Sequence, residues 1–371
     1  MIPVAVPYIA KNSIKYVTAA LEKGAVSGLF GEDLPIFEQE FADFVGTRHA
    51  VACSNGTVAI HLPLAAKGIG PGDEVLVSAL TNMATFFAVL YCGATPIPVD
   101  VDLATLNMSV SDARKKITTR TKAVLVVHLF GQPAEMTELM AMAKQHGLDV
   151  FEDCAESHGA AVGGKLTGSF GLAGCFSFFA NKVINTGEGG MVTTNDPSLA
   201  DRMRSIKSLA FGKTEKFLHE GIGYNYRMDN LKAALGRAQM EEAHEIVAQK
   251  IRMGQAYDEL LAGEDLLVLP VQRSDVVNVY WMYHVRLADS VAAKRNALMA
   301  RLASAGVETR PGFVSYTLQP FADPEIVVAY PCPVAEKVSY STFYIPSSQT
   351  IDFQTQQQVS LVLGESLRAV A

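Results

Sequence analysis

The chain has 371 residues, of which 49% are hydrophobic and 19% are Asp, Glu, Lys or Arg. This balance excludes a disordered polymer, and the length predicts about two domains, each with its own buried core. The formal net charge of −7 provides no general basic surface for a nucleic-acid backbone, so we expect no nucleic-acid partner.

Two helices are expected at the start of the chain. Ile14, Val17 and Leu21 repeat at helical spacing within residues 12–24, and phenylalanine repeats every three or four positions within residues 34–46. Both segments end at a glycine, which commonly terminates helices. These segments therefore predict two amphipathic helices before the first strand.

Short apolar strands then alternate with helices. The expected strands are residues 49–55, 73–79, 95–102, 122–130 and 148–156. The segments between them include helical patterns that begin at residues 56, 81 and 134. This alternation predicts βαβ units, and hence an α/β fold with a mainly parallel sheet covered on both faces. In such sheets ligands bind beyond the carboxyl ends of the strands.

The last third of the chain has a different pattern. Residues 228–263 predict one long, charged helix, followed by a strand at 278–287 and a helix at 291–306. We expect a large domain at residues 1–240 and a smaller α+β domain at residues 241–371.

The cysteines and the apolar runs indicate the compartment. The five cysteines form no CxxC pair and show no zinc-type spacing, so we expect free thiols and no metal site. The N-terminal segment lacks the basic start of a signal peptide, and no apolar run reaches the ~20 residues of a membrane helix. We therefore expect a cytoplasmic protein with no membrane partner.

Three strand-end loops carry residues with chemical potential. Gly56 and Thr57 follow a strand and begin a helix, which suits a bound anion or a plain helix cap. Glu152 and Asp153 end an apolar strand, and a carboxylate there could hold a protonated ring nitrogen, ligate a metal, cap a helix or pair with an arginine. Lys182 could form a Schiff base or simply extend to solvent. Pyridoxal phosphate needs an anion site, an acid and a lysine together.

Motifs along nearly the whole chain carry a family resemblance. They include SGLFGEDLPIFEQEFADFVG, ACSNGTVAIHL, EDCAESHGA, FSFFANKVINTGEGGMVTTND and GYNYRMDNLKAALGRAQ. In these the chain resembles the pyridoxal-phosphate-dependent nucleotide-sugar aminotransferases of the DegT/DnrJ/EryC1/StrS family, and most resembles the branch that includes GDP-perosamine synthase. The resemblance implies a fold-type-I architecture, with a seven-stranded, mainly parallel sheet in the large domain.

The matching positions imply catalytic roles for three residues. Lys182 would form the Schiff base with pyridoxal 5'-phosphate, Asp153 would pair with the pyridine nitrogen, and Glu156 would lie near the phenolic oxygen. With its ring nitrogen protonated, the cofactor can take up carbanion charge from the substrate. The free Lys182 amine could then move the proton between carbon atoms.

The family also implies how the phosphate of the cofactor is bound. Gly56, Thr57 and Ser177 would bind it from one subunit. Asn225 would reach the phosphate of the neighbouring subunit's cofactor, because the family builds its sites across a dimer interface. The resemblance therefore implies a homodimer with shared active sites.

One departure from the family concerns ring stacking. Asn82 occupies the cofactor-binding position where many relatives have an aromatic residue, so its side chain cannot stack on the cofactor ring. Phe86 or Phe87, one turn further along, could compensate.

The resemblance also implies the substrates. Glutamate would leave its amino group on the cofactor, which becomes pyridoxamine 5'-phosphate, and would depart as 2-oxoglutarate. A nucleotide-linked keto sugar would then collect the amino group. A 4-keto-6-deoxyhexose of the perosamine type is expected, for surface polysaccharide or glycoside biosynthesis. Arg227 and Arg310 are candidates for contacting the nucleotide sugar, and Thr317 replaces a histidine of the loop near the sugar.

Three alternatives remain open. They are a nucleotide-sugar 3-aminotransferase, a dehydratase on the same fold, and a non-catalytic regulatory paralogue. Dehydratase relatives carry histidine in place of the Schiff-base lysine, whereas this chain has Lys182. A degenerate paralogue should have lost Lys182, Asp153 or Ser177, and all three are present.

Overall fold

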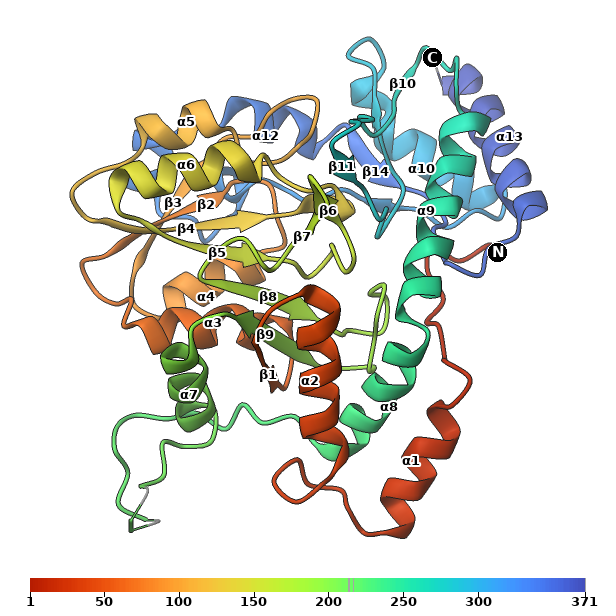
Figure 1. Ribbon diagram of the computed structural model, residues 1–371. Coiled ribbons are helices and arrows are strands. Elements are labelled where there is room, and N and C mark those ends of the chain that lie inside the picture. Colours follow the sequence, from red (N-terminus) through yellow and green to blue (C-terminus); the bar gives the residue numbers. More distant parts are fainter. Residues whose placement is uncertain (213, 216, 371) are drawn as a thin grey trace.

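One sheet of seven strands organises the first 194 residues of the computed structural model, which describes residues 1–212, 214–215 and 217–370. The strand order is β1-β9-β8-β5-β4-β2-β3 (Figure 1). These strands are β1 (His49–Cys53), β2 (Glu74–Ser78), β3 (Thr95–Val99), β4 (Thr121–Val127), β5 (Asp149–Asp153), β8 (Ala173–Ser177) and β9 (Gly190–Thr194). Only β9 runs antiparallel to its neighbours within this sheet, which confirms the predicted fold class.

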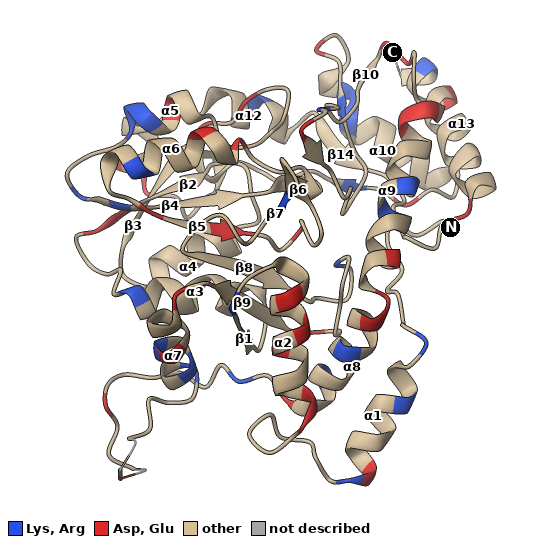
Figure 2. Ribbon diagram, viewed as in Figure 1, with Lys and Arg blue, Asp and Glu red and all other residues tan. Residues whose placement is uncertain are grey.

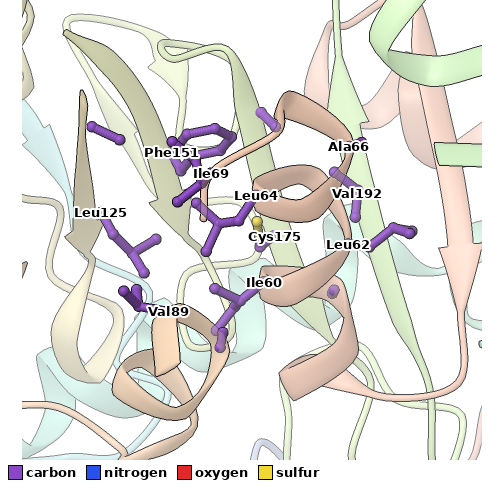
Figure 3. Close-up of a cluster of buried hydrophobic side chains, with 14 of the residues drawn as sticks. Ile60, Leu62, Leu64, Ala66, Ile69, Val89, Leu125, Phe151, Cys175 and Val192 are labelled. Atoms are coloured by element: carbon purple, nitrogen blue, oxygen red, sulfur yellow. The ribbon is translucent and has the colours of Figure 1, made fainter. Parts of the chain in front are cut away.

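Helices cover both faces of this sheet, as its apolar strands require. They are α2 (Asp33–Val45), α3 (Gly56–Lys67), α4 (Ala84–Tyr91), α5 (Val110–Lys115), α6 (Met136–His146) and α7 (Pro197–Ile206), whereas α1 (Ser13–Glu22) packs on α8 (Asn230–Glu241). Successive strand residues point to opposite faces: Val75 and Val77 pack with α3 and α4, whereas Leu76 packs with α6. Figure 3 shows the first of these cores, in which Ile60 and Leu64 of α3 lie among the strand residues.

The second half of the chain begins with a break in the predicted long helix. The single helix expected over residues 228–263 is wrong, because α8 (Asn230–Glu241) ends where Glu242 leaves helical geometry and α9 (Ala243–Leu260) begins beyond it. Figure 1 shows α9 rising from α8 toward the C-terminal elements. The domain boundary at residues 240/241 stays a prediction.

A smaller antiparallel sheet follows, with its own core. Its order is β10-β12-β14-β13, and the strands are β10 (Leu267–Val268), β12 (His284–Leu287), β14 (Thr342–Tyr344) and β13 (Arg310–Pro311). It packs with α9, α10 (Arg295–Ser304) and α13 (Phe353–Val370). The strand expected at residues 278–287 is shortened to β12, because Tyr280 adopts φ 46° and interrupts extended geometry.

Two further groups of elements connect the halves. A three-stranded sheet pairs β11 (Val276–Val277) with β6 (Ala161–Val162), which also pairs with β7 (Lys165–Leu166). The short helices α11 (Pro324–Ala329) and α12 (Pro333–Ser339) return to the edge of the large sheet. Figure 2 shows Lys and Arg segments interspersed with Asp and Glu segments across the ribbon. Among the described residues, no helix is both long and apolar enough to cross a membrane.

Candidate active site

A cavity of about 650 Å³ opens where β1, β4, β5 and β8 reach their carboxyl ends. This is where parallel sheets bind ligands, because the strand-to-helix loops diverge there. Seven residues singled out from the sequence line the cavity: Gly56, Thr57, Asn82, Asp153, Glu156, Ser177 and Lys182. The tertiary structure thus brings together groups that lie up to 126 positions apart in the sequence.

One end of the cavity is suited to an anion. Asn55 is in extended conformation and its side-chain oxygen accepts the Val58 N–H at 3.0 Å, which begins α3 beside Ser177. A side chain at Gly56 would place its Cβ 2.6 Å from Cβ of Ser177, so only glycine permits this close approach. The helix N-terminus carries partial positive charge, and the Ser177 hydroxyl lies next to it.

Asp153 forms the buried floor of the cavity at the end of β5. Its Oδ2 accepts the Thr85 hydroxyl at 2.8 Å, and its Oδ1 accepts the Ala155 N–H at 3.1 Å. Burial raises the pKa of Asp153, while these two hydrogen bonds and the positive charge of Lys182 oppose that rise. A buried carboxylate with few partners favours a cationic ligand, such as a protonated ring nitrogen.

The neighbouring Glu152 faces away from the cavity and has a structural role. Its two oxygens accept the N–H groups of Gly168, Phe170 and Gly171, each at 2.8 Å. His128 accepts the Ala134 N–H at Nδ1, so its Nε2 carries the proton that faces Glu152 at 3.1 Å. The carboxylate therefore anchors the loop at residues 167–171, although Glu152 also lies close to two potential metal ligands.

Lys182 lies in the cavity with little exposure to solvent. Its Nζ lies 3.9 Å from Oε1 of Glu156, whose Oε2 accepts the Phe130 N–H at 2.7 Å. Burial lowers the pKa of Lys182, and the carboxylates of Glu156 and Asp153 oppose this. Burial also raises the pKa of Glu156 to about 7. A lysine with a lowered pKa has a larger neutral fraction, and neutral amines are nucleophiles.

The sequence did not single out the aromatic side of the cavity. Trp281, Phe313 and Tyr344 line it, and all three belong to the last third of the chain. Phe130 lies behind them, with its backbone at φ 56° and its ring 5.4 Å from that of Phe313. The available signal was the single tryptophan of the chain, which stands in a segment expected to be a strand.

Phe86 and Phe87, which were expected to compensate for the missing ring at Asn82, lie elsewhere in the fold. Phe86 stacks on Tyr316 in the core, with ring centroids 4.1 Å apart, and Phe87 packs near Phe321 at 5.2 Å. Neither phenylalanine lines the cavity. Asn82 does line it, and its side-chain oxygen accepts the Ala84 N–H at the start of α4.

Four predicted residues lie away from this cavity of their own chain. Asn225 is exposed, and Arg227 lines a second cavity of about 340 Å³ that also contains Lys207. Arg310 is exposed and pairs with Glu308 at 2.6 Å. Thr317 is buried, with its hydroxyl 2.8 Å from that of Ser315. The roles of all four stay predictions.

Known proteins resemble this chain along most of its length. Residues 7–363 match the model of the DegT/DnrJ/EryC1/StrS aminotransferase family. GDP-perosamine synthase of Caulobacter vibrioides is 40% identical over 90% of this chain and 91% of its own length. An aminotransferase structure from Psychrobacter cryohalolentis has a TM-score of 0.92 at 30% identity, covering 99% of this chain and 100% of that one. The S. venezuelae DesV structure, in complex with a ketimine intermediate, has a TM-score of 0.86 at 32% identity, covering 96% and 94%.

Proposed function

This chain belongs to the DegT/DnrJ/EryC1/StrS aminotransferase family, and on that basis we propose that it transfers an amino group from glutamate to a nucleotide-linked keto sugar with pyridoxal 5'-phosphate. The observation that carries the proposal is the cavity in which an anion site, a buried acid and a buried lysine meet. GDP-perosamine synthases among its relatives favour a 4-keto-6-deoxyhexose as the acceptor. Polysaccharide biosynthesis in the cytoplasm is the role we propose, and five free cysteines suit that reducing compartment.

The residues of the cavity fit the cofactor. The start of α3 and the Ser177 hydroxyl would bind the phosphate, and the close approach at Gly56 leaves the backbone accessible to it. Asp153 would accept a hydrogen bond from the protonated ring nitrogen, and Lys182 would bond to the aldehyde carbon. Glu156 would lie near the phenolic oxygen. Once bound, pyridoxal phosphate supplies an electron sink for the breaking C–H bond.

The side chains themselves then bind, orient and move protons. The negative charge of Asp153 stabilises a positive ring nitrogen, and the Thr85 hydroxyl orients that carboxylate. Lys182 carries a proton at Nζ and can release it because burial lowers its pKa. Trp281, Phe313 and Tyr344 limit the access of water.

A second copy of the chain would complete the site. Helix α1 exposes Ile14 by 79%, and the segment before α2 exposes Phe30 by 85%. A protein partner would cover such large apolar side chains. Asn225 is exposed and Arg227 lines a separate cavity, so both are available to a neighbouring subunit. We therefore propose a homodimer with shared sites.

A visible spectrum tests the proposed cofactor chemistry. Purified protein supplied with pyridoxal phosphate should show an absorbance band that borohydride abolishes, because a lysine-bound cofactor is reducible. Lys182→Ala should lack this band, whereas the exposed control Lys165→Ala should keep it. A band of equal strength in Lys182→Ala would refute the assignment of Lys182.

A substrate panel tests the acceptor. GDP-, dTDP- and UDP-linked 4-keto-6-deoxy sugars, each with glutamate, should include one that gains an amino group as 2-oxoglutarate appears. Amination of a 3-keto sugar alone would instead favour the nucleotide-sugar 3-aminotransferase. Because 2-oxoglutarate would leave before the keto sugar reacts with the aminated cofactor, ping-pong kinetics are expected.

A further inference from the structure

Trp281 places its indole ring against the amine of Lys182. The distance from Nζ of Lys182 to the ring centroid is 3.9 Å, and Trp281 is only 4% exposed. It is the single tryptophan of the chain and precedes β12 in the C-terminal half. The contact therefore joins the segment before β12 of the smaller sheet to the loop after β8, which carries the lysine.

Three contacts hold the indole in this place. Its Nε1–H donates to the carbonyl of Asn181, the residue before the lysine, at 2.8 Å. The backbone carbonyl of Trp281 accepts Nζ of the buried Lys250 at 2.9 Å. The Phe130 ring is nearly parallel to the indole, at an interplanar angle of 13° and a centroid distance of 6.4 Å. The bond to Asn181 satisfies the buried indole N–H and fixes the ring relative to the loop that carries the lysine.

The amine thus lies between an aromatic ring and a carboxylate. Glu156 Oε1 lies 3.9 Å from the same nitrogen that the indole contacts. Tryptophan is the aromatic side chain that attracts a cation most strongly, and the attraction is greatest where water is excluded. Both neighbours therefore favour the ammonium form of Lys182 over the neutral amine.

We propose that Trp281 is a positioning residue that holds the free ammonium group of Lys182 on its ring, opposite Glu156, whenever the lysine is not bonded to the cofactor. This inference rests on the proposed role of Lys182. The lysine must leave the cofactor and return to it in each cycle, and a fixed resting position shortens the search for the reacting geometry. As a positioning residue, Trp281 acts only through Lys182 and forms no bond with substrate or cofactor.

Tryptophan emission in cofactor-free, full-length protein tests the contact itself. Because Trp281 is the only tryptophan, a change of its emission with pH reports a group that titrates near it. Lys250 bonds to the Trp281 carbonyl and the Tyr344 ring lies 6.2 Å from the indole, so both groups can also contribute. We therefore expect a transition that Lys182→Met abolishes, that Lys250→Met and Tyr344→Phe keep, and that Glu156→Gln moves to lower pH, since the carboxylate stabilises the ammonium. If Lys182→Met removes no transition of the wild-type protein, the proposal is overturned.

Kinetics of the loaded enzyme test the consequence. Trp281→Leu removes the ring and should lower kcat about tenfold with little change in KM for glutamate, whereas Trp281→Phe should stay within about threefold of wild type. Equal losses in both variants, or none in Trp281→Leu, would contradict the ring's role. If Trp281→Leu does not fold, the emission titration and Trp281→Phe decide.

The two proposals fail in different ways. If wild-type protein lacks the borohydride-sensitive band, the proposed function fails whatever the emission shows. If the band is present in Trp281→Leu at full rate, only the inference about Trp281 fails.

Discussion

Burial of Lys250 should make the stability of this protein rise with pH. The residue lies in α9 with 2% exposure, and its Nζ donates to the carbonyls of Trp281 and Ser347. It forms no salt bridge with any residue that the structure describes. Burial lowers the pKa of Lys250 to about 7, because two neutral carbonyls replace water only in part.

The sign and size of the effect follow from linkage. Above the folded pKa of about 7 and below the ordinary 10.5, the unfolded chain binds this proton and the folded chain does not. The free energy of unfolding therefore increases as pH rises through this window, by about 5 kcal/mol at most. Between pH values of about 7 and 9 the expected gain is roughly 2 kcal/mol.

Urea unfolding followed by circular dichroism measures this gain. Wild type, Lys250→Met and the exposed control Lys294→Met should be compared near pH 7 and pH 9 at one protein concentration. The loss of two hydrogen bonds in Lys250→Met is a cost at both pH values, so it cancels when the two differences from wild type are compared. Relative to Lys250→Met, wild type and Lys294→Met should each gain roughly 2 kcal/mol. An unchanged difference would refute the lowered pKa.

Three further predictions concern the cavity. Gly56→Ala would place Cβ 2.6 Å from Cβ of Ser177, so absorbance titration should show at least about tenfold weaker binding of pyridoxal phosphate. The Thr85 hydroxyl donates to Asp153 and lowers the pKa of that carboxyl. Thr85→Val removes this hydroxyl, so the acid limb of kcat/KM should move to higher pH, and Thr85→Ser should restore it. Glu156→Gln should remove an ionisation near pH 7 from the pH profile of activity, and a profile identical to wild type would contradict the raised pKa.

Local signals in the sequence were sufficient for five of the seven strands of the main sheet. Each of the five strands expected before residue 157 appears, because short apolar runs between glycine-rich turns need only neighbouring residues to be recognised. Predictions failed where a tertiary contact overrode the local pattern. Tyr280 adopts φ 46° above Gly254 of α9, and this shortens the strand expected at residues 278–287.

In the candidate site, too, the sequence indicated some of the residues and the fold decided the roles of others. Gly56, Asp153 and Lys182 were found from the sequence because each stands at a strand end with a residue type unusual for its surroundings. Two adjacent carboxylates end β5, and the residues alone did not separate them. The family resemblance favoured Asp153, and the fold shows that Glu152 binds backbone amides while Asp153 lines the cavity.

By itself the sequence determined the α/β architecture, the acidic and weakly charged character, and the strand-end residues on which the proposed chemistry depends. Only the tertiary structure decided which side chains surround Lys182. Trp281 lies 99 positions further along the chain, and Thr85 reaches Asp153 across 68. Such contacts depend on how helices and sheets pack, which no local periodicity encodes, so the aromatic side of the cavity became apparent only in three dimensions.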